Sequence, residues 1–200
     1  KFSPSSVDPA KAEEIRKRYG VQQDELLVSF CGRLGKEKSV DVLLENWAKT
    51  VKPEDKLKLM IIGGGPCLPE LKEQAAALGI NDQVIFTDAI DHNQLVDYYG
   101  ACQLYVTASL SDTNSISMKE AMATGLPVVH IHDPLNKGQI VAGVNGYIYQ
   151  DAGEMYAAFQ DFQKKSPEEK EAFRASVINS MKSYSSEALA RYLVGVYEKS

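Results

Sequence analysis

Two acidic side chains near the middle of the sequence have the spacing of groups that share one binding cleft. Asp112 and Glu120 are eight positions apart, about two turns of a helix, so both carboxylates can line the same side of a cleft. Glu120 is followed by small apolar residues at 121–123, which indicates a closely packed helix and a partly buried acid with no obvious partner. Buried acids of this kind usually have a ligand or a pairing group. The alternative is that Asp112 caps the helix and Glu120 is solvated.

A loop at residues 32–39 carries three cations, Arg33, Lys36 and Lys38. It is not a Walker A loop, because Glu37 stands where that motif needs its second glycine, and the dinucleotide-binding fingerprint also fails. Guanidinium and ammonium groups in an otherwise acidic protein suit a diphosphate. The alternative is a solvated basic loop.

Extended apolar runs alternate with amphipathic helical stretches, a pattern typical of a parallel sheet with helices on both faces. Strands are expected at 25–32, 57–62, 84–87, 104–107, 128–131 and 146–149, and helices at 8–18, 40–49, 69–78, 92–99, 114–123, 155–164, 167–183 and 186–199. We therefore predict one α/β domain over residues 1–200, a doubly wound, Rossmann-like, three-layer parallel sheet without an internal linker.

The loops that carry the chemistry directly follow predicted strands. In an open parallel sheet, ligands bind beyond the carboxyl ends of the strands, where helix N-termini offer unpaired N–H groups. The loop at 32–39, the loop Gly63-Gly64-Gly65-Pro66 and the hydroxyl-rich stretch 109–115 each follow a strand in this way. Three glycines let another backbone or a ligand come close, or they make a tight turn. The sequence predicts a site at this edge of the sheet.

Composition excludes several classes of function. The chain has 22 Lys plus Arg against 27 Asp plus Glu, a net charge of −5, so it lacks the basic stripe of a nucleic-acid-binding protein. No apolar run approaches the roughly 18 residues of a membrane span. Cys31, Cys67 and Cys102 lack the paired spacing of a disulfide framework or zinc site, so we expect reduced core thiols in a reducing compartment.

Two histidines form a possible metal-binding pair. His130 and His132 alternate along a predicted strand, so both imidazoles can project from one face and chelate a metal. A third ligand at a recognisable spacing is missing from the sequence. We therefore expect a structural role for the pair and assign no metal site.

The stretch from Asp112 to Val129 resembles the donor-site signature of retaining glycosyltransferases with the two-Rossmann-domain GT-B architecture, the large family 4, group 1. That signature reads Glu, seven residues, Glu-Ala-Met-Ala, then Gly-x-Pro-Val-Val. Gly32-Arg33-Leu34 with Lys38 resembles the family's Gly-Arg-Leu loop, and Gly63 to Pro66 resembles its Gly-x-Gly-Pro turn. The resemblance runs from about Val28 to Tyr149 and keeps the family's order of motifs.

The resemblance implies that the chain is one half of a GT-B enzyme, the C-terminal half that binds the nucleotide-sugar. Phe2-Ser3-Pro4 resembles the segment that enters this half, so an N-terminal acceptor domain would precede it and the chain alone would be inactive. The whole enzyme would be a retaining hexosyltransferase with a UDP-sugar substrate. It would need no metal or cofactor, since side-chain cations replace the metal.

The resemblance also implies three catalytic residues. Arg33 and Lys38 would bind the diphosphate and hold the negative charge that grows as it leaves. Asp112 would lie beside the transferred sugar, in the position of the signature's first acid.

Donor-binding roles follow from the same resemblance. Glu120 would accept hydrogen bonds from the ribose hydroxyls, and the backbone at Ala89-Ile90 would contact the base. Asn114, Ser115 and Ile116, as the first turn of a helix, would present backbone N–H groups to the phosphate and the sugar hydroxyls.

The sequence departs from the family at several positions. Asp112 replaces the usual Glu, Thr113 and Ser115 replace small glycines, and Asp88 stands where glycine is common. The run 112–117 is most similar to a variant found in bacterial enzymes that glucosylate diacylglycerol. This similarity implies a UDP-glucose donor, a glycolipid product and a cytoplasmic enzyme whose missing domain touches the inner face of the cell membrane.

Two other functions stay open at this point. The departures at Asp112, Thr113 and Ser115 are compatible with a degenerate transferase domain that binds a nucleotide or a partner without chemistry. A periplasmic-type small-molecule receptor, or another Rossmann-like binding protein, has only the fold class in its favour.

Overall fold

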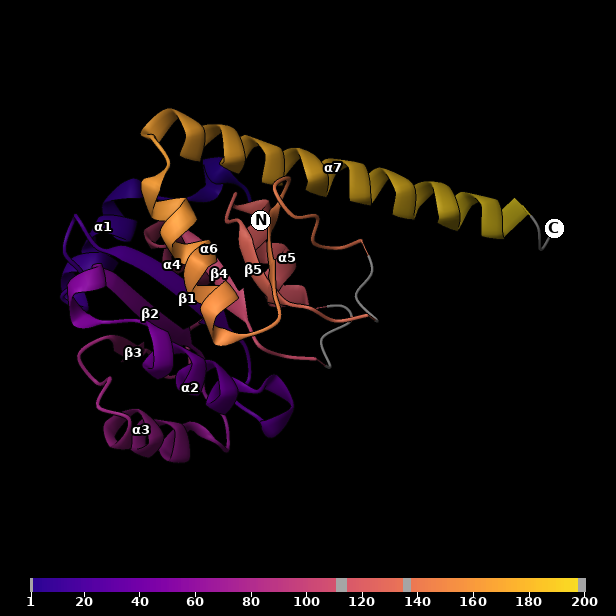
Figure 1. Cartoon of the computed structure of the whole chain (residues 1–200). Helices are drawn as coiled ribbons and strands as arrows, with labels where there is room; N and C mark the ends of the chain where they lie inside the picture. The colour runs from indigo at the N-terminus through magenta and orange to yellow at the C-terminus, as the bar shows by residue number, and fades with distance from the viewer. Residues whose placement is uncertain (1, 111–114, 135–137, 198–200) are drawn as a thin grey trace.

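The computed structural model describes residues 2–110, 115–134 and 138–197. These residues form a six-stranded sheet with helices on both faces (Figure 1), and neighbouring strands pair in parallel. The strands are β1 (Leu26–Cys31), β2 (Leu57–Ile62), β3 (Val84–Phe86), β4 (Leu104–Thr107), β5 (Val128–Ile131) and β6 (Gly146–Tyr149). The predicted fold class, a doubly wound Rossmann-like sheet, is confirmed.

The order of the strands locates the binding edge of the sheet. The order is β3-β2-β1-β4-β5-β6, so the chain builds outward from β1 in one direction and then returns to build outward in the other. The direction reverses between β1 and β4, and a crevice opens at such a point beyond the carboxyl ends of the strands. Both strands are buried along their whole length, which explains their continuous apolar sequence.

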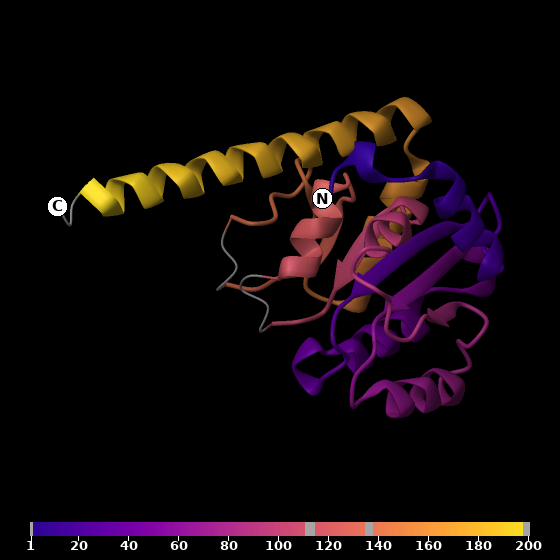
Figure 2. The ribbon, with the colours of Figure 1, turned by 180° about the vertical axis from the view of Figure 1, so that it is seen from behind.

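Helices cover the sheet in two layers. One face carries α2 (Val40–Thr50), α3 (Leu68–Ala77) and α6 (Ala152–Lys164), and the other carries α1 (Pro9–Arg18), α4 (Leu95–Ala101) and α5 (Ile116–Ala123) (Figures 1 and 2). Short 3-10 turns lie at Pro4–Ser6, Lys36–Lys38 and Pro53–Asp55. On the first face, Trp47 packs against Phe159 with ring centroids 5.5 Å apart, and its indole N–H donates to Gln83.

Helix α4 begins later than predicted. The sequence predicts a helix from His92, whereas α4 begins at Leu95. The carboxylate of Asp91 accepts a hydrogen bond from the Asn93 N–H at 2.7 Å, and the Asp91 carbonyl accepts from the Gln94 N–H at 2.9 Å. An aspartate side chain that bonds the backbone two residues on favours a turn over a helix. His92 therefore lies in a turn, outside the helix.

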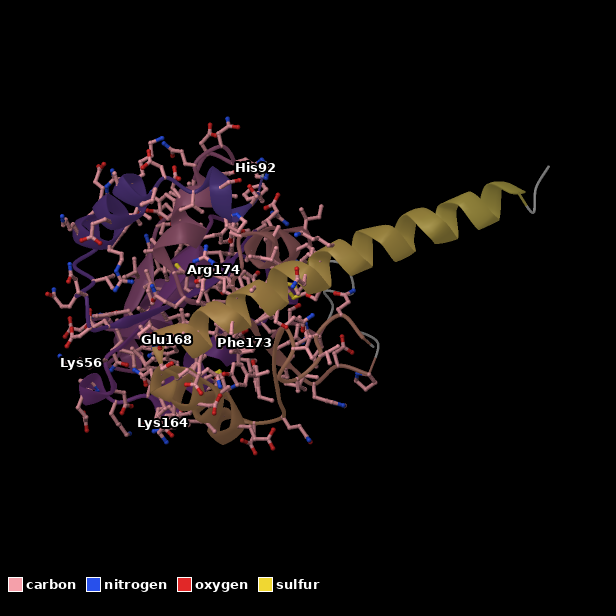
Figure 3. The ribbon with its side chains drawn as sticks, turned by 90° about the horizontal axis from the view of Figure 1, so that it is seen from above. Lys56, His92, Lys164, Glu168, Phe173 and Arg174 are labelled. Atoms are coloured by element: carbon pink, nitrogen blue, oxygen red, sulfur yellow. The ribbon has the colours of Figure 1, made fainter. Side chains whose placement is uncertain are left out.

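The C-terminal helix is continuous, so the predicted break between residues 183 and 186 is wrong. A single helix, α7 (Pro167–Tyr197), replaces the two that were predicted. Serines cost a helix only roughly 0.5 kcal/mol each relative to Ala, and no glycine or proline stands between Glu168 and Val194. The first half of α7 packs on α5, where Arg174 donates to the Thr124 carbonyl, and the helix then runs past the sheet (Figures 1 and 3).

The cysteines occupy the interior, as predicted. All three thiols are free; Cys31 and Cys102 are buried and Cys67 is half-buried. Burial raises the pKa of Cys102 to about 12. In the part of the chain that the structure describes, no helix is long and apolar enough to cross a membrane.

Candidate functional site

A cavity of about 590 Å³ opens at the carboxyl ends of β1 and β2, next to the crevice between β1 and β4. Four segments line it, each at the end of a strand or the start of a helix. Its walls are Cys31, Gly32, Arg33 and Lys38 after β1, Ile62, Gly63 and Gly64 after β2, Ala89, Ile90, His92 and Leu95 after β3, and Ser115, Ile116, Ser117 and Glu120 at α5. The sequence-predicted residues within the described segments thus meet in one place, and their individual roles remain predictions.

Two cationic side chains stand on the loop that follows β1. Arg33 is exposed and Lys38 is half-buried at the end of the short 3-10 turn. The hydroxyl of Ser109, after β4, donates to the carbonyl of Glu37 at 3.0 Å, which ties this loop to the neighbouring strand end. The cavity therefore has a positive rim in a protein of net charge −5.

The glycine-rich loop after β2 lets the backbone of the first loop come close. Gly63 has a φ of +135°, and a Cβ there would lie 2.1 Å from the Gly32 carbonyl oxygen. The Gly32 N–H donates to the Ile62 carbonyl at 3.0 Å, and the Leu34 N–H donates to the Gly64 carbonyl at 2.9 Å. The structure therefore contains the close approach of another backbone, one of the alternatives left open in the sequence.

The start of α5 is fixed to the end of β1. Ser115 is the N-cap, and its hydroxyl accepts from the Met118 N–H at 3.3 Å. The Ser117 hydroxyl donates to the Cys31 carbonyl at 2.7 Å, and the Tyr105 hydroxyl donates to the same oxygen at 3.0 Å. The helix begins at Ile116, later than the predicted start at residue 114, and the exposed N-terminal turn faces the cavity. Sequence reasoning did not single out Ser117.

A tight turn places Ile90 at the cavity. Asp88 has a φ of +60°, a left-handed conformation that Asp tolerates better than most residues. This explains why glycine is common at the position. The Asp88 carbonyl accepts from the Gly63 N–H at 3.1 Å, and its carboxylate pairs with Lys72 at 3.1 Å.

Glu120 is a partly buried acid, as expected from the sequence, and His92 is its pairing group, which the sequence analysis did not identify. Its side chain is 15% exposed, and the Oε1 atom lies 2.8 Å from Nε2 of His92, whose side chain is 57% exposed. His92 lies at the periphery of the molecule in Figure 3. The sequence contained a signal for the position of His92 but not for its pairing with Glu120, since His92 follows shortly after a predicted strand, at the same edge as the other loops.

The remaining sequence predictions concern Asp112, Asn114 and the pair His130 and His132. Asp112 and Asn114 lie outside the described residues. His130 hydrogen-bonds through Nδ1 to the Ile131 carbonyl at 2.5 Å. Within the segments that the structure describes, no group of three or more His, Cys, Asp or Glu side chains could hold a metal ion.

The thiol of Cys31 lines the cavity and is buried. Burial, together with the nearby charge of Glu120, raises its pKa to about 11, although a hydrogen bond with Tyr99 lowers it. A thiol with such a pKa is protonated near neutral pH, and the thiolate is the reactive form. The groups that line the cavity suit electrostatic and hydrogen-bonding interactions: two cations, a carboxylate, an imidazole, two serine hydroxyls and backbone N–H groups.

The family model for glycosyl transferases group 1 matches residues 11–178. This chain belongs to that family. The alpha-monoglucosyldiacylglycerol synthase of Streptococcus pneumoniae (strain ATCC BAA-255 / R6) is 32% identical to this chain over 168 residues. The aligned region covers 84% of this chain and 38% of the synthase. The chain spans about two fifths of the length of such curated relatives.

Solved structures agree with the group 1 assignment. The crystal structure of Anabaena Alr3699/HepE in complex with UDP-glucose has a TM-score of 0.75 at 18% identity, over 95% of this chain and 56% of that one. The C-terminal domain of a glycosyl transferase group 1 family protein (LpcC) from Francisella tularensis has a TM-score of 0.73 at 19% identity, over 91% of this chain and 94% of that one. These likenesses show the fold, a Rossmann-like α/β domain of the kind found in GT-B glycosyltransferases.

Proposed function

We propose that this chain is the C-terminal, donor-binding half of a retaining, metal-independent hexosyltransferase that moves glucose from UDP-glucose to the hydroxyl of a lipid. The observation that carries the proposal is the cavity at the strand ends. It brings Arg33, Lys38 and Glu120 together with the N-terminus of α5. Cations suit a diphosphate, and a carboxylate suits hydroxyl groups.

The diphosphate end of the donor lies at the loop after β1. Arg33 offers a planar fork of N–H donors and Lys38 a mobile point charge, and both stabilise the negative charge that grows on the departing diphosphate. Ser115 and Ile116 at the N-terminus of α5, and Asn114 before them in the sequence, add backbone donors toward the phosphate and the sugar. Asp112 lies beside the transferred sugar. These groups neutralise the leaving group without a divalent cation.

The nucleoside end lies between the turn after β3 and α5. The backbone at Ala89-Ile90 contacts the base, and the Glu120 carboxylate accepts hydrogen bonds from the ribose hydroxyls. Both lie on the cavity wall in the structure. The Glu120 side chain is 15% exposed, and a charge-assisted hydrogen bond to it is stronger than one at an open surface.

The proposed donor, acceptor and missing half rest on the relatives. UDP-glucose is the ligand named for Alr3699/HepE, and two curated relatives are alpha-monoglucosyldiacylglycerol synthases. An N-terminal acceptor domain is supported by the 38–39% of those two relatives that the chain spans and by its match to 94% of the LpcC C-terminal domain. A diacylglycerol acceptor would bring that domain to the cytoplasmic face of the membrane.

Titration calorimetry of this chain with UDP, ADP and GDP tests the donor site. We expect UDP to bind more tightly than the other two, and equal affinities would contradict a UDP-sugar donor. The longer protein, incubated with UDP-glucose and diacylglycerol, should yield an α-glucoside visible by NMR. A β-glucoside would contradict retention, and UDP binding without any transfer would indicate a non-catalytic module.

A further inference from the structure

His92 occupies a position that the function above leaves unexplained. It is 28 residues from Glu120 in the sequence, lines the same cavity and lies 2.8 Å from the Glu120 Oε1 atom. The carboxylate is 15% exposed, so few water molecules compete for it. An uncompensated acid at such a site is costly, and the imidazole supplies a compensating donor.

The imidazole is itself held in place from two sides. Its backbone belongs to the turn that the Asp91 carboxylate stabilises, just before α4. The ring of Phe2 packs on it with centroids 5.3 Å apart at an interplanar angle of 60°, and Phe2 also packs on Tyr99 at 6.0 Å. Tyr99 is buried and donates to the Ser117 carbonyl of α5 at 3.2 Å. The His92 ring thus bridges the N-terminal segment and the helix that carries Glu120.

The hydrogen bond to His92 gives the two oxygens of the Glu120 carboxylate different roles. In the described part of the chain, the side-chain hydrogen bond of Glu120 uses Oε1. A carboxylate has two oxygens and about four lone-pair sites, so Oε2 and the remaining sites of Oε1 can accept from a ligand. An anchored carboxylate loses less side-chain entropy on binding than one that moves freely.

We propose that His92 is the positioning residue of the nucleoside end of the site: it anchors Glu120 so that the carboxylate can accept from a hydroxyl of the ribose. This inference rests on the proposed function, because it takes the ligand to be a uridine nucleotide. His92 acts through Glu120 and need not touch the nucleotide. Removal of the imidazole should therefore weaken the contact that Glu120 makes with a ribose hydroxyl, and leave the diphosphate contacts in place.

Calorimetric titration of the chain with UDP and with 2′-deoxy-UDP tests the inference. In the native chain we expect loss of the 2′-hydroxyl to weaken binding about tenfold, the effect of one hydrogen bond to a charged group. In His92→Ala we expect the ratio of the two affinities to fall to about threefold or less, since an unanchored carboxylate discriminates poorly. His92→Gln, which places an N–H donor near the same point, should restore most of the ratio.

Controls separate anchoring from general damage. Gln94→Ala changes an exposed side chain of the same turn that faces a different cavity, between α1 and α4, and it should keep the native ratio. Thermal melting of each variant reports stability, and a merely structural His92 would lower the melting temperature with the ratio unchanged. A native ratio in His92→Ala overturns the inference, as does a native chain that binds UDP and 2′-deoxy-UDP equally. Failure of the native chain to bind UDP at all would instead overturn the proposed function.

Discussion

Glu120 and Asp161 each accept a hydrogen bond from a ring-bearing side chain, and their surroundings differ. Glu120 is held by His92 at 2.8 Å in the cavity wall. Asp161 of α6 accepts from the Tyr147 hydroxyl of the edge strand β6 at 2.7 Å, and Lys165 lies 3.1 Å from the same oxygen. Phe173 packs on Tyr147 and so marks the position of the Asp161 pair. In Figure 3, Phe173 lies well apart from His92.

The difference between the two pairs separates a binding role from a stabilising one. Asp161 has both a donor and a cation, and the Tyr147 hydrogen bond, followed by Lys165, lowers its pKa. The described partner of the Glu120 carboxylate is one imidazole, and the acid lines a cavity of about 590 Å³. Glu120, whose charge is partly compensated and which lies beside the cavity, is suited to bind a ligand. Asp161, whose charge is compensated by a hydroxyl donor and a cation, joins α6 to β6.

The largest expected contrast between the two regions concerns their glycines. At Gly63 an added Cβ would meet the Gly32 carbonyl at 2.1 Å with φ at +135°, whereas Gly143, near Tyr147, has φ at +78° and open space around it. We expect Gly63→Ala to cost more than about 3 kcal/mol and Gly143→Ala about 1–2 kcal/mol. Urea unfolding midpoints measure both. Similar midpoints would contradict the close contact of the two loops.

Cationic side chains should show the next largest contrast. Arg33→Ala removes the proposed charge-assisted hydrogen bond to the diphosphate, so we expect UDP affinity to fall about ten- to a hundredfold, equivalent to about 1.5–3 kcal/mol. Lys165→Ala removes a cation from the Asp161 pair and should leave UDP affinity unchanged. Calorimetry of both variants makes the comparison, and unchanged affinity in Arg33→Ala would remove Arg33 from the site.

Amide substitutions of the two acids sharpen the comparison directly. Glu120→Gln keeps shape but replaces a charged acceptor with a neutral one, so we expect a loss of about 1–2 kcal/mol in UDP affinity and little change in melting temperature. Asp161→Asn should lower the melting temperature and leave UDP affinity intact. If Glu120→Gln loses stability and keeps full affinity, Glu120 has the structural role and the donor-site argument fails.

The smallest expected effect is on the Tyr147 hydroxyl. Tyr147→Phe should cost about 0.5–1 kcal/mol of unfolding free energy at neutral pH, because the Asp161 pair is at the surface. The lowered pKa of folded Asp161 means that its contribution is present above the unfolded pKa, near about 4, and is lost as pH falls through the folded pKa. The stability difference between native and variant chains should therefore shrink in acid. A difference that grows below pH ~4 would contradict the assignment.

The sheet was predictable because its strands are short apolar runs that end in glycine or polar residues. All six strands lie where the apolar runs predict them, and the loops that carry Arg33, Lys38 and Ile90 meet at one edge, since parallel strands share a direction. Helix ends were less predictable. The start of α4 depends on a side-chain bond from Asp91, and the continuity of α7 on serines that a helix tolerates.

The pairing of His92 with Glu120 was not predictable from the sequence. His92 lies in the turn between β3 and α4, and Glu120 lies in α5, which follows β4. In the sheet, β3 and β4 are separated by β2 and β1. The meeting of the two residues depends on how α4 and α5 pack against one another. Side-chain directions in turns, unlike the period of a strand, leave no periodic signal in the sequence.

The backbone contact between the loops after β1 and β2 also determines when the cavity can exist during folding. Gly32 and Leu34 donate to Ile62 and Gly64, and the parallel pairing of β1 with β2 requires the whole crossover between them, α2 included, to be in place. No local fragment of the chain can assemble this cavity in advance. A partly unfolded population therefore lacks the site altogether. Because a ligand draws reversibly unfolded chains back to the folded state, the apparent affinity in a titration should fall in proportion to the folded fraction, while the stoichiometry at saturation stays the same.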